Sequence, residues 1–393
     1  MKRFTALLSF ILLSSGVLLG SAYHESNPEK PTQEEYVIED WEFETSGQIF
    51  SGVILIDGVI YIGNENGDFY ALDLEGNEVW RFKADHAIRS TAVVYGKIVS
   101  FTSGNQLYGL NIASGNLEWK HEPTESVQDP IGPQDQWDIK DSSPVLKESV
   151  AYYGNEYGHI YGVDMSNGNE VYDFKTTNAA TIRSKPVFKG DILFFGDQAG
   201  HVFALNVATD KLVWSIETFV GDKLYPEYGG IFGEMVVEGN ALYFGSRNGQ
   251  LKVLNTETGV IDWTAGNVNG TWFSGIPVIK DDVLYIGTSD SHELVAFNTS
   301  GKQLWRTPTT ESVYNAVIVT DDHVITLTCD SSYPDQFPSI GHIHILKYNG
   351  TVDKSIELPG GVYHSPKLVD GALYFASRNS KIYKMDLKNL LQE

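Results

Sequence analysis

The sequence predicts an all-β protein in which one four-stranded unit is repeated eight times. Aromatic or basic residues recur in a common local context, near the middle of a strand-like segment. Six of these positions are tryptophan and two are not: Trp41, Trp80, Trp119, Tyr172, Trp214, Trp263, Trp305 and Lys354. Their spacing of roughly 40 to 50 residues is typical of a propeller or a solenoid.

Each unit contains four short strand-like segments in the same order. In the first unit these are residues 52–58, 59–63, 68–73 and 78–83, separated by turns that contain glycine. The third segment nearly always ends in Asp or Asn: Asp73, Asn111, Asp164, Asn206, Asn255, Asn298 and Asp386, with Lys347 as the exception. Because such side chains accept backbone N–H bonds at turns, we interpret these residues as turn-forming rather than catalytic.

The last unit, residues 362–387, supplies three strands and then the chain ends. Residues 37–45, which carry Trp41, can supply the fourth. Closing the ring in this way removes the exposed edges of an open array. The sequence therefore predicts an eight-bladed β-propeller of four-stranded antiparallel blades, with one domain over residues 36–393 and a ring closed by the N-terminal strand.

The N-terminus is typical of a secretory signal peptide. Basic residues at 2 and 3 precede an apolar run over 4–19 and the small residues 20–22, which predicts cleavage after Ala22. The alternative is a membrane anchor, but the run is short and contains three serines. Residues 23–35 are polar with two prolines and are expected to form a flexible lead-in. We expect a periplasmic or secreted monomer with no membrane span after cleavage.

The formal net charge of −23 argues against a nucleic-acid binder or a protein that adheres to anionic membranes, because both need clustered basic residues. The single cysteine, Cys329, excludes an internal disulfide, so stability must come from a large core. We expect Cys329 to be a buried small residue; the alternative is a reactive thiol.

The repeat resembles the PQQ-like β-propeller family, whose blades are locked by docked tryptophans. The family pattern stands as Tyr70-Ala71-Leu72-Asp73 before Trp80, as Phe203-Ala204-Leu205-Asn206 before Trp214, and as Thr258-Gly259 before Trp263. The resemblance covers residues 36–388. It implies a blade-docking role for Trp41, Trp80, Trp119, Tyr172, Trp214, Trp263 and Trp305.

Two branches of this family differ in function. Quinoprotein alcohol dehydrogenases hold pyrroloquinoline quinone (PQQ) and calcium and usually carry an adjacent Cys–Cys disulfide, which one cysteine cannot form. BamB-like proteins are periplasmic scaffolds of outer-membrane protein assembly, and length, blade number and export signal suit this branch. Members usually carry a lipid-attachment cysteine, where this chain has Gly20-Ser21-Ala22.

The resemblance therefore implies a non-enzymatic binding scaffold of the bacterial cell envelope without a bound cofactor. Its partner would be an envelope protein or a small ligand at the channel mouth. Two alternatives are a PQQ-dependent dehydrogenase and a periplasmic sensor of small ligands that uses the same mouth.

The inner strands of a propeller line its central channel, so their equivalent positions predict what the channel presents. One column reads Phe50, Arg89, Asp141, Arg183, Phe232, Ser274, Asn315 and Tyr363; the next is small almost throughout but ends in His364. Two arginines in an acidic protein would suit a carboxylate or phosphate ligand. The alternative is a structural Arg89–Asp141–Arg183 ion-pair network.

Three long connections, at residues 121–140, 217–230 and 329–341, are expected on the same face of the ring. Because loops on rigid scaffolds often carry function, we expect this face to bind a partner. Its aromatic candidates are Trp137, Tyr225, Tyr228, Trp272, Phe273, Tyr333 and Phe337. The alternative is that these loops fold over the channel and plug it.

No catalytic motif is evident in the sequence. The pair His342 and His344 lies two residues apart on one face of a strand, but no third metal ligand is identifiable. We expect a strand surface there rather than a metal site.

Overall fold

The computed structural model describes residues 40–123, 141–218, 230–266, 272–330 and 339–391. The chain divides into Met1–Val37, which lies outside these residues, and Ile38–Glu393. The signal peptide and lead-in expected at residues 1–35 are therefore not described. Within the described ranges, no helix is both long and apolar enough to cross a bilayer.

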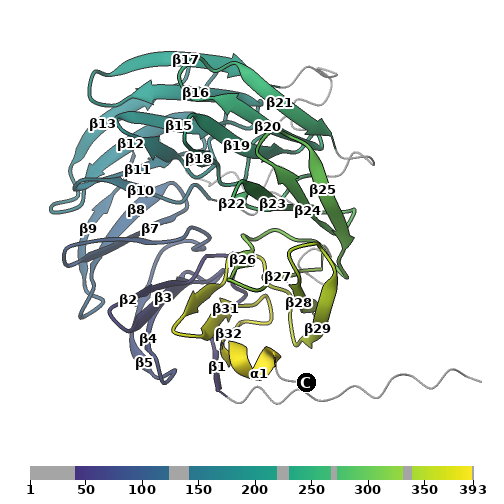
Figure 1. The fold of residues 1–393 in the computed structure, drawn as a ribbon. Helices are drawn as coiled ribbons and strands as arrows, with labels where there is room; N and C mark the ends of the chain where they lie inside the picture. Colours follow the sequence, from purple (N-terminus) through teal and green to yellow (C-terminus); the bar gives the residue numbers. More distant parts are fainter. Residues whose placement is uncertain (1–39, 124–140, 219–229, 267–271, 331–338, 392–393) are drawn as a thin grey trace, which may run out of the picture. The chain divides into compact units, whose positions relative to one another are not determined.

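The described residues form eight four-stranded antiparallel sheets, which confirms the predicted propeller (Figure 1). Blades 1 to 4 are β2 (Ile54–Ile56), β3 (Val59–Gly63), β4 (Asp68–Asp73) and β5 (Glu78–Lys83); β6 (Val93–Tyr95), β7 (Ile98–Ser103), β8 (Gln106–Asn111) and β9 (Leu117–His121); β10 (Val145–Lys147), β11 (Val150–Gly154), β12 (His159–Asp164) and β13 (Glu170–Lys175); β14 (Val187–Lys189), β15 (Ile192–Gly196), β16 (His201–Asn206) and β17 (Lys211–Glu217).

Blades 5 to 8 continue around the ring, and a short helix, α1 (Leu387–Leu391), follows the last strand. Their strands are β18 (Val236–Glu238), β19 (Ala241–Ser246), β20 (Gln250–Asn255) and β21 (Ile261–Gly266); β22 (Val278–Lys280), β23 (Val283–Gly287), β24 (Glu293–Asn298) and β25 (Gln303–Pro308); β26 (Ile318–Val319), β27 (Val324–Leu327), β28 (Gly341–Leu346) and β29 (Val352–Leu358); β30 (Lys367–Val369), β31 (Ala372–Ala376), β32 (Lys381–Asp386) and β1 (Trp41–Glu44).

The ring closes as the sequence predicts. Strand β1 pairs with β32, so the first described strand is the outermost strand of the last blade. Thr45 extends this junction, since its backbone N–H and its hydroxyl both donate to the carbonyl of Ser380. No sheet of the described chain lacks its fourth strand.

The hydrophobic core lies between successive blades rather than inside one sheet. Phe69 of blade 1 stacks on Phe101 of blade 2, with ring centroids 4.1 Å apart, and both rings are buried. Similar clusters fill the other junctions. Because each blade packs both of its faces against neighbours, the middle strands are buried at nearly every residue, as in β3, β4 and β7.

A β-bulge precedes the tryptophan position in the outer strand of blades 1 to 7. In blade 1, Glu78 lies opposite Leu72 and Trp80 opposite Ala71, so Val79 is the extra residue. A bulge of this kind bends the strand and redirects the next side chain. Val79 is exposed, whereas Trp80 is buried.

The six tryptophans dock onto the following blade. Each indole Nε1–H donates to a backbone carbonyl of that blade at 2.8 to 3.1 Å: Trp41 to Leu74, Trp80 to Ile112, Trp119 to Met165, Trp214 to Thr256, Trp263 to Thr299 and Trp305 to Tyr348. The ring lies over a glycine with positive φ, where an added Cβ would come within 2.6 to 2.8 Å of an indole carbon: Gly76, Gly115, Gly168, Gly259, Gly301 and Gly350.

The junction between blades 3 and 4 departs from this arrangement in both partners. Tyr172 replaces the tryptophan, and Asp210 with a φ of 53° replaces the glycine. The Tyr172 hydroxyl donates to the Asp210 carboxylate at 2.7 Å. A hydrogen bond between side chains thus replaces the packing of an indole ring on a glycine. Asp210 must then adopt a left-handed backbone conformation, which is unfavourable for a residue with a Cβ atom.

We predict that Tyr172 and Asp210 are energetically coupled. Tyr172→Trp alone should destabilise the protein by about 1–3 kcal/mol, because the indole would collide with the Asp210 side chain. Adding Asp210→Gly should recover most of that loss. Urea denaturation of the single and double variants measures the coupling. Asp281→Gly is the matched control, since Asp281 also has a positive φ, 51°, but lies in blade 6; equal coupling there would contradict the prediction.

Candidate functional site

In five blades a small polar side chain before the inner strand donates a hydrogen bond to a backbone carbonyl. The hydroxyls of Ser51, Ser90 and Ser184 donate to carbonyls twelve residues later, in the second strand of the same blade. These bonds hold the preceding residue at one end of the channel. We call those preceding residues the mouth ring: Phe50, Arg89, Asp141, Arg183, Phe232, Ser274, Tyr314 and Tyr363.

In blade 7 the structure corrects the sequence alignment by one residue. The Asn315 side chain donates to the carbonyl of Leu327, twelve residues later, so Asn315 occupies the serine position and Tyr314 the mouth ring. The strand pairing agrees, because Ile318 faces Ile325 as Ile54 faces Tyr61 in blade 1. The alignment missed this because Leu327 replaces the glycine used as its landmark.

Two arginines of the mouth ring are held by glutamates from the preceding blade. Arg89 binds Glu65 through two N–H groups at 2.8 and 2.9 Å. Arg183 binds Glu156 in the same way at 2.9 and 3.0 Å. Both glutamates are the second residue of the turn between the second and third strands. Both guanidinium groups therefore bind carboxylates of the protein's own side chains.

Asp141 lies between these two pairs. Burial is the largest influence on its carboxyl group and raises its pKa to about 7, and the nearby Glu156 and Glu65 carboxylates act in the same direction. Arg89 and Arg183 oppose this rise. The sequence-based alternative of an Arg89–Asp141–Arg183 network thus has the right members, but the bidentate ion pairs run to Glu65 and Glu156.

The blade 5 side of the mouth holds an arginine among aromatic rings. The guanidinium carbon of Arg247 is 4.0 Å from the centroid of Trp272 and 5.0 Å from that of Phe232. Only 5% of Arg247 is exposed. Stacking of this type stabilises a buried cation.

The blade 8 side combines an arginine with an aromatic cluster. Arg378 lies 5.6 Å from the Phe50 ring and donates to the backbone carbonyl of Asp330 at 3.0 Å. Tyr363 contacts Phe50 edge to face and stacks on Tyr314 with centroids 4.8 Å apart. Four of the six arginines among the described residues thus gather at one end of an acidic protein's channel.

The candidate site residues named from the sequence lie in different environments. Arg89, Asp141 and Arg183 come together. Tyr363 packs instead with Phe50 and Tyr314, and Trp272 lies against Arg247. Phe273 is 3% exposed and packs against Phe297 between blades, so it belongs to the core. His364 contacts Thr91 of blade 2. Trp137, Tyr225, Tyr228, Tyr333 and Phe337 lie outside the described residues.

Sequence reasoning missed four charged residues of the mouth: Glu65, Glu156, Arg247 and Arg378. All four lie two residues after the same position of the second strand, which is occupied by Gly63, Gly154, Gly245 and Ala376. An alignment of this turn across the blades shows that these four equivalent positions are charged.

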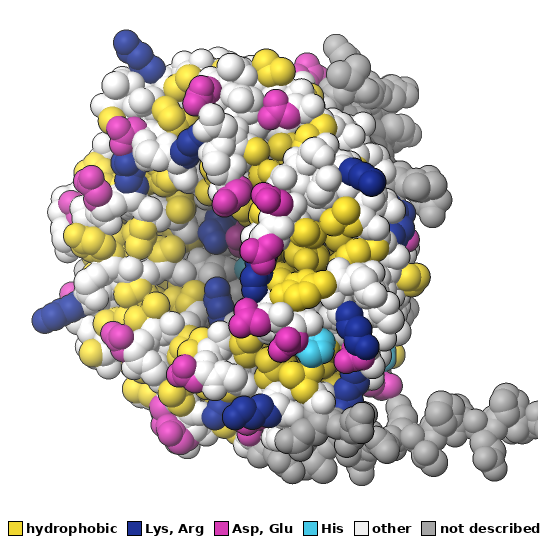
Figure 2. Space-filling view, viewed as in Figure 1, with side chains coloured by type: hydrophobic (Ala, Val, Ile, Leu, Met, Phe, Trp, Pro, Cys, Tyr) yellow, Lys and Arg dark blue, Asp and Glu magenta, His cyan; other side chains and the backbone are white. Residues whose placement is uncertain are grey.

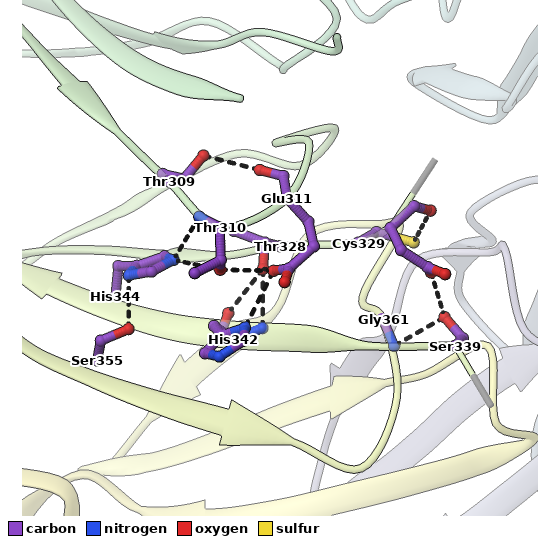
Figure 3. Close-up of polar contacts among 11 residues, drawn as sticks. Thr309, Thr310, Glu311, Thr328, Cys329, Ser339, His342, His344, Ser355 and Gly361 are labelled. Carbon is purple, nitrogen blue, oxygen red and sulfur yellow. Dashed lines mark hydrogen bonds and ion pairs between the residues drawn. The ribbon is translucent and has the colours of Figure 1, made fainter. Parts of the chain in front are cut away.

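The histidine pair of blade 7 is engaged in hydrogen bonds (Figure 3). His342 Nδ1 lies 3.1 Å from Glu311, while His344 contacts Thr310 at 3.1 Å and Ser355 at 2.9 Å. Burial lowers the pKa of His344 to about 4, so this ring is neutral at pH 7. Over the residues described, no group of three or more His, Cys, Asp or Glu side chains could hold a metal ion.

Cys329 is fully buried beside the same cluster. Burial raises the pKa of its thiol to about 12, although Arg378 opposes the rise. A thiol with that pKa is a poor nucleophile at neutral pH.

Comparison with known proteins identifies the family. The family described as outer membrane protein assembly factor BamB matches residues 38–181 and 247–335, which is more than half of the chain. The chain belongs to this BamB-like family of PQQ-like propellers. One curated relative, the outer membrane protein assembly factor BamB of Nitrosomonas eutropha, is 26% identical over 132 residues. That match covers 33% of this chain and 30% of the relative's length.

Solved structures of BamB-like and quinoprotein propellers share the fold. BamB from Moraxella catarrhalis superposes with a TM-score of 0.68 at 17% identity, covering 88% of this chain and 98% of that one. Quinohemoprotein alcohol dehydrogenase from Comamonas testosteroni gives 0.69 at 11% identity, covering 88% and 75%. A europium-containing methanol dehydrogenase gives 0.66 at 14%, covering 86% and 84%. At these identities the likeness concerns the fold alone.

We predict that the two glutamates of the mouth differ in their contribution to stability. Glu156→Gln should cost about 3–5 kcal/mol, because it leaves the Arg183 guanidinium, 4% exposed, without its carboxylate. Glu65→Gln should cost less, because 21% of the Arg89 side chain is exposed and water can replace the lost partner. Urea denaturation at pH 7 compares the two variants, and a larger loss for Glu65→Gln would contradict this account.

Asp141 should give stability a distinct pH dependence. Since its folded pKa of about 7 lies above the ordinary 3.8, its stabilising contribution is complete below pH 4 and is lost as the pH rises through 7. Asp141→Asn should therefore gain stability over the wild type as pH rises from 5 to 8, by up to about 1.4 kcal/mol per unit. Denaturation at several pH values tests this, with Asp321→Asn as the exposed control; parallel wild-type and Asp141→Asn curves would refute it.

Proposed function

We propose that this protein is an exported, non-enzymatic binding scaffold of the bacterial cell envelope, similar in kind to BamB-like proteins. The family match over residues 38–181 and 247–335 carries the proposal. The N-terminal sequence typical of a signal peptide supports export. The specific partner is a protein of the envelope, by analogy with relatives that are named as outer-membrane assembly factors.

The architecture supports a role in binding. A closed ring held by docked tryptophans is a rigid platform, and rigid platforms present binding loops without paying for their ordering at each encounter. The mouth holds aromatic side chains and the arginines Arg183, Arg247 and Arg378, and these residue types dominate protein interfaces. We infer that the face around the mouth ring, with its long connections, receives the partner.

A quinone-dependent activity fits the residues less well. Calcium needs several oxygen ligands at one point. In this mouth the carboxylates of Glu65 and Glu156 are committed to arginines, and Asp141 lies between two guanidinium groups. The one cysteine is buried and cannot form the adjacent disulfide expected beside the quinone. The described residues therefore do not form a site suited to PQQ and calcium.

The proposal is tested by crosslinking in the native envelope followed by affinity purification of the tagged chain. Recovery of outer-membrane assembly proteins is the expected result. Trp137→Ala and Tyr225→Ala should lower that recovery about tenfold, equivalent to ~1.4 kcal/mol, with an unchanged melting temperature. Tyr95→Ala, at an exposed tyrosine that ends the first strand of blade 2, is the matched control.

Two outcomes would overturn the proposal. Equal recovery with all three variants would show that this face does not bind the partner. Saturable binding of PQQ in the presence of Ca²⁺, together with dye-linked dehydrogenase activity, would place the protein among the quinoprotein dehydrogenases instead.

A further inference from the structure

One residue of the channel departs from the repeat. Seven blades carry Ser, Gly or Asn at the position that precedes the inner strand. In five of them this side chain donates a hydrogen bond to a backbone carbonyl of the same or the next blade. Blade 8 has His364 there instead. Its imidazole extends away from blade 8 and contacts Thr91 of blade 2, with Nε2 3.1 Å from the Thr91 hydroxyl.

The backbone is shaped for this contact. At Gly52 of blade 1, which lies between blades 8 and 2, an added Cβ would come within 2.7 Å of His364 Nδ1 and would collide with the Thr91 hydroxyl as well. Any larger residue would separate the two side chains. The glycine therefore makes room for a bond that passes over blade 1.

His364 also reaches across the channel. Its Nε2 lies 3.7 Å from a carboxylate oxygen of Glu234, which belongs to blade 5, and the other oxygen of Glu234 accepts from Lys185 of blade 4 at 3.0 Å. Blades 5 and 8 are not neighbours, so this approach must cross the middle of the ring. Side chains of both signs also surround the hollow at the centre of the face shown in Figure 2.

The hydrogen bonds define the protonation state of the ring. The Ser365 backbone N–H donates to His364 Nδ1 at 2.8 Å, so Nδ1 must carry a lone pair. In the neutral ring the proton is then on Nε2, which can donate to Thr91. The charged groups that face this ring are Glu234 and, through it, Lys185; Thr91, Gly52 and Ser365 are neutral. With 15% of the His364 side chain exposed, solvent protons can reach it.

We propose that His364 is a proton-operated latch on the channel axis, which ties blade 8 to blade 2 when neutral and to blade 5 when charged. A proton added to Nδ1 meets the Ser365 N–H, so that bond is lost and the ring must turn. The resulting imidazolium is attracted to the Glu234 carboxylate, which already lies 3.7 Å from Nε2. Acidification thus exchanges the Thr91 contact for a stronger contact with Glu234.

The test follows the purified chain by NMR, with labelled histidine rings and labelled threonine methyl groups, between pH 8 and pH 5. We expect His364 as the Nε2–H tautomer at pH 8, and a Thr91 methyl resonance that shifts with the His364 midpoint. Glu234→Gln should lower that midpoint by about 1 pH unit, because the imidazolium loses its counter-charge. His323→Gln, at a partly exposed histidine 3.5 Å from Asp353, is the control and should leave the midpoint unchanged.

Gly52→Ala supplies a second variant that does not alter any charge. Its methyl group should force Thr91 and His364 apart, so the Thr91 signal should no longer respond to pH. A His364 ring that stays neutral down to pH 5, a Thr91 resonance indifferent to its titration, or an unchanged midpoint in Glu234→Gln would each overturn the proposal. Crystal structures at pH 8 and pH 5 would show whether the ring turns.

Discussion

The docked tryptophan is the interaction on which the ring depends. Each indole reaches from the outer strand of one blade to a carbonyl and a glycine of the next, as Trp80 does with Ile112 and Gly115. The bulge at the preceding residue turns the side chain toward that neighbour. Because the same contact recurs around the ring, blades without strong mutual sequence identity still meet at one angle. At one of the two junctions without a tryptophan, Tyr172 and Asp210 change together, as expected if the contact itself is what is required.

The fold could be predicted because its determinants are local and repeated. The position of Trp41 before the first complete unit already indicated that the ring closes through the N-terminal strand, and β1 pairs with β32. The error in blade 7 arose where a repeated landmark is absent, since Leu327 stands where other blades have glycine. One residue of misalignment then placed Asn315 in the mouth ring instead of Tyr314.

The candidate site was less predictable because its contacts join different blades. Arg89 and Arg183 were evident as exceptions in an acidic sequence, but nothing local relates them to Glu65 and Glu156. Arg247 and Arg378 lie in turns, where a charged residue is usually solvated and gives no signal. The binding role of Trp137, Tyr225 and Tyr228 stays a prediction, since these residues lie outside the described ranges.

Closure by β1 also constrains the order in which the protein can be built. The side chains of Glu42 and Lys381 pair across 339 residues of sequence, so β1, the first strand of the described chain, completes its sheet only after β32 has been synthesised. Blades 1 to 7 can form from neighbouring segments as they emerge, whereas blade 8 must wait for both ends of the chain. Until then β1 is an unpaired strand with an exposed Trp41, and blade 8 offers a bare edge to any extended chain nearby. The same junction that seals the finished ring is therefore its most vulnerable point during assembly.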